Sequence, residues 1–67
     1  MQEIRDCFGK LVCMADAATG TIERMTSRER ICVILPLGGR FAFETKSAYT
    51  EVERVQECLF RVNSFPN

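Results

Sequence analysis

The 67-residue sequence contains no histidine, and its nine Lys and Arg residues balance nine Asp and Glu residues. Without histidine, a serine or cysteine nucleophile lacks the side chain that most often serves as its general base. Without a basic excess, the chain lacks the charge that neutralises phosphates in strong, sequence-independent binding of nucleic acids. These two absences count against an enzyme and against a general nucleic-acid binder.

Long apolar segments are also missing. No run approaches the roughly 20 apolar residues that a membrane-spanning helix needs. Residues 1–6 include charged side chains where a secretion signal has its apolar core. We therefore expect a cytoplasmic protein that makes no contact with a membrane.

The four cysteines include no CxxC pair; they are Cys7, Cys13, Cys32 and Cys58. Zinc sites of small domains use closely spaced thiolates and imidazoles, and this sequence has neither. Because the chain shows no export signal, we expect reduced and largely buried thiols rather than disulfides. The sequence thus predicts no metal site, no cofactor and no catalytic residues.

The length limits the chain to a single small domain, residues 1–67, near the lower limit of independent folding. Hydrophobic residues make up 46% of the chain and charged residues 27%, which is a globular composition and argues against disorder.

The most informative segment is an uninterrupted apolar run, residues 31–35, followed after a turn by the alternating residues 40–44. A continuous apolar run is typical of a strand buried on both faces, and alternation is typical of a half-buried strand. The Pro and Gly residues between them predict a β-hairpin. Its expected core residues, with Leu35 opposite Phe41 and Val33 opposite Phe43, are Ile31, Val33, Leu35, Phe41 and Phe43.

A second hairpin is predicted from residues 11–15 and 21–26, joined by the loop 16–20. Asp16 can accept hydrogen bonds from backbone N–H groups at the start of the loop. Gly20 can adopt the positive φ that closes a type I turn with a bulge.

Residues 48–62 fit two patterns. The apolar residues recur at helical spacings of three and four. The same stretch also fits a hairpin with the loop 56–58, in which Val55 faces Leu59, Val52 faces Val62 and Glu53 faces Arg61. Because β-branched residues are frequent and helix caps are missing, we expect the hairpin, followed by a tail over residues 63–67.

Short strands with turns every eight to twelve residues predict an all-β fold. We expect a small antiparallel meander, or an SH3-like or open barrel, of five to six short strands. The alternative is an α+β fold, a β-meander with a C-terminal helix over about residues 48–62.

The expected function is that of a non-enzymatic interaction module, a homodimer that also binds a protein partner. So small a chain has difficulty covering both faces of a sheet, and the second face of strand 31–35 therefore needs a cover. Alternation places Cys32, Ile34 and Ala42 on that face, which makes them the candidates for self-association. The alternative cover is a terminal segment that folds back as a lid.

A small nucleic-acid-binding β-barrel is the alternative function. It would use a rim of arginines at one end of the sheet to bind phosphates of RNA or DNA. Interleaved glutamates cancel most of the field of this rim, so we rank it second. The candidate rim residues are Arg24, Arg28, Arg30 and Arg40.

Overall fold

The computed structural model describes all 67 residues, which form seven antiparallel strands and no helix. The first sheet has the order β1-β2-β3-β4 and the second β5-β6-β7. The predicted all-β meander is confirmed, with seven strands instead of five to six. Their bounds are β1 (Gln2–Arg5), β2 (Leu11–Asp16), β3 (Thr21–Met25), β4 (Arg30–Ile34), β5 (Arg40–Glu44), β6 (Ala48–Gln56) and β7 (Leu59–Pro66).

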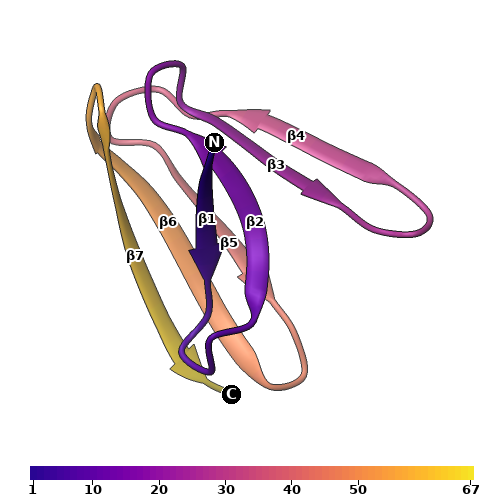
Figure 1. Cartoon of the computed structure of the whole chain (residues 1–67). Helices are drawn as coiled ribbons and strands as arrows, with labels where there is room; N and C mark the ends of the chain where they lie inside the picture. Colours follow the sequence, from indigo (N-terminus) through magenta and orange to yellow (C-terminus); the bar gives the residue numbers. More distant parts are fainter.

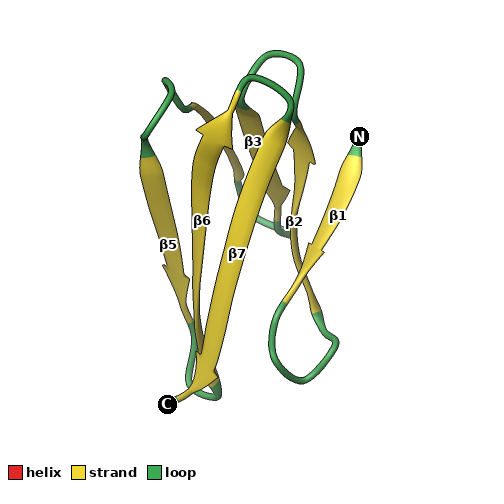
Figure 2. Ribbon diagram, turned by 90° about the vertical axis from the view of Figure 1, so that its left-hand side faces the viewer, coloured by secondary structure: helices red, strands yellow, loops and turns green.

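The core lies between the two sheets. Figure 2 shows β6 and β7 in front of β2 and β3, with β5 at the left and β1 at the right. Alternate residues of each strand point inward, as the pleat requires, and three of them, Ile4, Ile22 and Val52, are 1% exposed or less. The buried cluster consists of Ile4, Val12, Cys13, Ala15, Ile22, Leu35, Phe43, Val52 and Phe60.

The predicted core residues all face the interior to some degree. Leu35 and Phe43 are buried, while Val33 and Phe41 are partly buried and pack against the core cluster. Ile31 is half-buried. The apolar pattern therefore identified the inward face of both strands.

The predicted hairpin between residues 31–35 and 40–44 is wrong. β4 pairs with β3, whereas β5 pairs with β6 in the other sheet. The segment between them crosses from one sheet to the other: the Leu35 N–H donates to Gly20 O at 2.8 Å, and Gly39 O accepts from the Arg54 N–H at 2.9 Å. Both strands still share one core, because apolar faces can meet across two layers as well as side by side within one sheet.

The other two predicted hairpins are confirmed. Asp16 begins the β2–β3 turn by accepting the Gly20 N–H at its carbonyl (2.8 Å) and the Ala18 N–H at its carboxylate (3.0 Å). Gly20 has φ +80°. In the β6–β7 hairpin, Val52 lies opposite Val62 and Glu53 opposite Arg61, as predicted. The predicted pair of Val55 and Leu59 is wrong: Leu59 lies opposite Gln56, because an irregularity between Arg54 and Gln56 shifts the register.

The helical alternative for residues 48–62, and with it the α+β fold, is wrong, as is the C-terminal tail. Residues 63–66 belong to β7 and pair with the first four residues of β6, from Glu51 to Ala48. β6 is nine residues long and extends far enough to give these residues a partner. Backbone pairing with a long neighbour thus orders a segment that has no apolar pattern of its own.

Arg54 joins the two sheets at one end of the sandwich. Its Nη1 donates to Leu35 O at 2.9 Å and its Nη2 to Glu57 O at 3.2 Å. Gly20 lies directly beside this contact, because a Cβ there would be 2.4 Å from Leu35 O and 2.7 Å from Arg54 Nη1. Gly20 is therefore required both by its positive φ and by the close approach of the two sheets.

Candidate functional site

β4 is an edge strand, and β3 is its only strand neighbour. The backbone groups on its other edge therefore have no strand partner, which makes the edge a template for pairing with another chain. Ile34 is 70% exposed, and Cys32 is also exposed. The prediction that this strand is buried on both faces is wrong, because the outer face of the first sheet has no layer above it.

The structure brings together two of the three residues predicted for self-association. Cys32 and Ile34 lie on the outer face of β4, opposite Glu23 and Thr21 of β3. Ala42 is exposed, but it lies on β5 in the second sheet.

Neither terminal segment forms the lid that was the alternative cover. β1 occupies the opposite edge of the first sheet from β4, and the C-terminal residues belong to β7 of the second sheet. Ile34 consequently remains open to solvent.

A groove opens between β2 and β3 where the two strands diverge. Their pairing ends with Met14 opposite Glu23, although both strands continue beyond that pair. Figure 1 shows the β3–β4 hairpin pointing away from β2 on this side. The groove has a volume of about 290 Å³ and is lined by Leu11, Val12, Cys13, Met14, Glu23, Arg24, Met25 and Thr26.

The four predicted rim arginines do not gather on one surface. The Arg24 guanidinium lies 5.3 Å from the centre of the Phe43 ring, a cation–π contact directed toward the core. Arg30 pairs with Glu23 at 2.9 Å, and this hydrogen bond raises the pKa of Arg30. Arg40 lies in the other sheet, and Arg28 lies in the β3–β4 turn.

Glu53 connects three strands on the outer face of the second sheet. Its carboxylate is 2.7 Å from Arg61 Nη2 on β7 and 3.7 Å from Arg40 Nε on β5. The hydrogen bond from Arg61 holds the pKa of Glu53 below its ordinary value. The predicted cross-strand pair of Glu53 and Arg61 is thus confirmed, and it engages Arg40 as well.

The thiols are more exposed than the sequence suggested. Only Cys13 is buried, and burial raises the pKa of its thiol to about 11 although the nearby positive charge of Arg24 lowers it. Cys7 and Cys58 lie in turns and Cys32 points outward from β4, so these three are exposed. No three His, Cys, Asp or Glu side chains are grouped where they could hold a metal ion.

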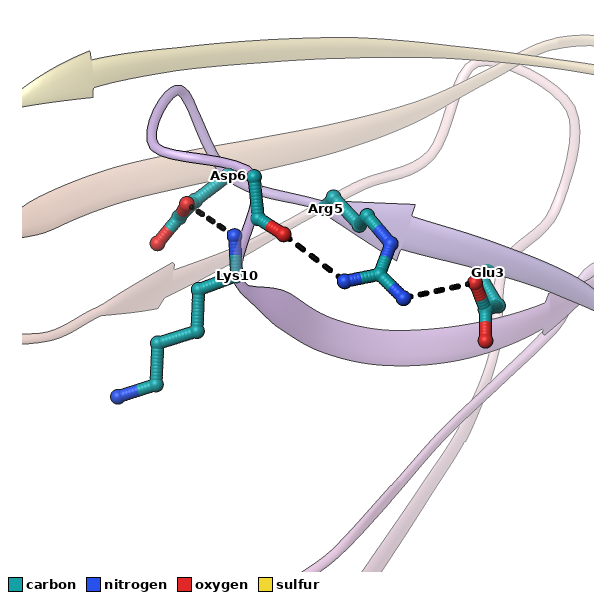
Figure 3. Close-up of polar contacts among 5 residues, drawn as sticks. Glu3, Arg5, Asp6 and Lys10 are labelled. Atoms are coloured by element: carbon teal, nitrogen blue, oxygen red, sulfur yellow. Dashed lines mark hydrogen bonds and ion pairs between the residues drawn. The ribbon is translucent and has the colours of Figure 1, made fainter.

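The β1–β2 turn, which precedes the groove residue Leu11, is closed by polar contacts (Figure 3). Arg5 donates to Glu3 Oε1 at 3.0 Å and to Gly9 O at 2.8 Å, while Asp6 accepts the Lys10 N–H at 2.9 Å. The Lys10 ammonium extends away from both carboxylates and forms no ion pair. It remains a free positive charge next to Leu11, which lines the groove.

Sequence reasoning missed both β1 and the groove. The Asp6 and Gly9 pair resembles the Asp16 and Gly20 pair, so the same turn signal would have found the β1–β2 hairpin. Nothing in the alternation of residues 11–14 and 23–26 marks the point at which the strands separate.

The fold contains no helix with the length and apolar character that a membrane crossing requires. Comparison with known protein families, with curated proteins and with solved structures found no match.

Proposed function

We propose that this chain is a non-enzymatic interaction module of the cytoplasm that self-associates as a homodimer and binds a protein partner. The observation that carries the proposal is the unpaired edge of β4, with Ile34 70% exposed beside it. The reducing cytoplasm suits a chain in which all four cysteines are free.

The β4 edge lacks the devices that keep natural edge strands from pairing. Such strands are commonly blocked by lysine, proline, a bulge or an inward-pointing charge. Residues 31–34 are all apolar, the one charged residue of β4, Arg30, is paired with Glu23 at 2.9 Å, and β4 pairs with β3 over five residues without a bulge. A regular edge of this kind can accept a second strand along its length.

A second copy is the simplest partner for this edge, because two-fold symmetric pairing satisfies both edges at once. Antiparallel pairing centred on the middle residue of β4 places Cys32 opposite the partner's Cys32. Ile31 then faces the partner's Val33, so apolar side chains meet on the inner face. The two four-stranded sheets would merge into one continuous sheet.

Sedimentation of the native chain and of Ile34→Lys tests the proposal, because the Cys32-centred register places residue 34 opposite the partner's Arg30, where a second positive charge is destabilising. We expect a native dimer at high micromolar concentration and a folded Ile34→Lys monomer, since a 70% exposed side chain tolerates the charge in the isolated chain. Leu37→Lys is the matched control, because Leu37 is 58% exposed in the loop after β4. A native monomer, or a dimer that survives Ile34→Lys, would contradict the proposal.

The register of the pairing is testable through Cys32. Facing residues of antiparallel strands have Cα atoms about 4.5–5.5 Å apart, within the roughly 4.4–6.8 Å range of disulfides. Mild oxidation should therefore cross-link the wild-type dimer covalently and leave Cys32→Ser uncross-linked. Cys58→Ser, which removes another exposed thiol, should cross-link like the wild type.

A further inference from the structure

We propose that the β2–β3 groove binds an extended peptide segment of a protein partner, and that this segment carries apolar and acidic side chains. The inference rests on the partner-binding part of the proposed function and gives it a site separate from the β4 edge. Three features of the groove carry it: unpaired strand backbone, apolar walls of limited volume, and unpaired positive charges.

The strands on both sides of the groove have backbone groups with which an added strand could form hydrogen bonds. On one side, Leu11 and Cys13 pair with β1, and on the other, Arg24 and Met25 pair with β4. No pairing crosses the groove beyond Met14 and Glu23, so the backbone groups that these residues direct into it have no strand partner. An extended peptide supplies donors and acceptors at the matching spacing, as in β-strand addition.

The walls suit apolar side chains. The volume of about 290 Å³ lies at the lower end of the roughly 300–1,000 Å³ of typical ligand pockets, and five of the eight lining residues are hydrophobic. Leu11 is 45% exposed and Met25 is 71% exposed, while Val12 is buried, with 9% of its surface exposed. Met14 and Met25 can adjust their rotamers around apolar side chains of different shapes, because methionine is unbranched and flexible.

The charges around the groove favour an acidic segment. Lys10 precedes the lining residue Leu11, and Arg24 lines the groove; neither forms an ion pair, and the Arg24 guanidinium lies 5.3 Å from the centre of the Phe43 ring. The carboxylate of Glu23 is already paired with Arg30 at 2.9 Å. Carboxylates of a peptide would therefore meet positive charge that no carboxylate of the chain neutralises, which aids encounter and orientation.

Selection from a phage-displayed library of random peptides tests this inference, with the full native chain as bait. We expect enriched peptides in which apolar residues alternate with Asp or Glu. Each enriched peptide is then synthesised, and its binding is measured by fluorescence anisotropy. Enrichment of basic peptides, or no enrichment, would overturn the inference.

Two variants test the site itself. Met25→Glu introduces a negative charge at an exposed position of the groove, and we expect it to weaken binding of the selected peptides at least about tenfold. Leu37→Glu makes the same kind of change outside the groove and should bind like the native chain. Equal binding by all three proteins would overturn the inference, and circular dichroism confirms that each variant is folded.

Amide chemical shifts separate failure of this site from failure of the proposed function. In the Ile34→Lys variant, the selected peptides should shift the amides of residues 11–14 and 23–26. Shifts confined to β4 would leave partner binding intact and overturn the groove assignment. Tighter binding of single-stranded oligothymidine than of the peptides would overturn both the peptide assignment and the partner-binding proposal.

Discussion

Truncation of Phe43 to alanine should remove most of the stability of this domain. The side chain is 6% exposed, its ring centre lies 5.0 Å from that of Phe41, and the Arg24 guanidinium lies 5.3 Å from it. Deleting a buried phenylalanine ring costs about 3–5 kcal/mol. A chain of 67 residues has a total stability of roughly 3–10 kcal/mol, at about 0.05–0.15 kcal/mol per residue.

Urea denaturation followed by circular dichroism measures this loss. With a slope of about 1 kcal/mol per molar urea, typical of small domains, the midpoint should fall by about 3 M or more. If the parent stability is near the lower end of that range, the variant is partly unfolded even without urea. All variants are compared at one protein concentration, because the proposed self-association would add to the measured stability.

The chain provides its own controls for Phe43→Ala. Phe8 is 63% exposed and Phe65 is 52% exposed, so alanine at either position removes a ring that is largely in solvent. We expect each to lower the free energy of unfolding by less than about 1.5 kcal/mol. If Phe43→Ala lost no more stability than Phe8→Ala, the core between the two sheets would be wrongly described.

Three further predictions concern single contacts. Gly9 and Gly20 have φ values of +81° and +80°, but only at Gly20 would an added Cβ have atoms within 4 Å. Gly20→Ala should therefore lower the urea midpoint much more than Gly9→Ala. The Gly9→Ala variant bears only the roughly 1–2 kcal/mol cost of the left-handed conformation. The pKa of Glu53 is lowered in the folded state, so the contribution of Glu53 to stability is present above the ordinary carboxyl pKa of about 4.3 and is lost as the pH falls below that value. The Glu53→Gln variant should therefore lose less stability than the native chain on acidification. Urea midpoints measured across the pH range check this. In the Ile34→Lys variant, a thiol reagent should label the exposed Cys7, Cys32 and Cys58 at once and Cys13 only on unfolding, because burial shields that thiol and raises its pKa to about 11. Four thiols labelled at the same rate would contradict this.

Local chemistry made two of the hairpins predictable. The β2–β3 turn depends on Asp16 and Gly20, which interact within five residues of one another. The β6–β7 register depends on Val52 facing Val62 and Glu53 facing Arg61, pairs that one short turn brings together. Such contacts need no knowledge of the rest of the chain.

The sequence by itself also determined which side of each strand faces the core, because alternation with a period of two assigns side chains to faces. Alternation does not identify the neighbouring strand, since backbone hydrogen bonds are the same for any partner. Only the tertiary structure decided that β4 pairs with β3 while β5 joins the other sheet, and this leaves β4 at an edge. The separation of β2 from β3 beyond Met14 and Glu23 was decided at the same level, because it depends on how the whole β3–β4 hairpin packs rather than on any residue in the groove.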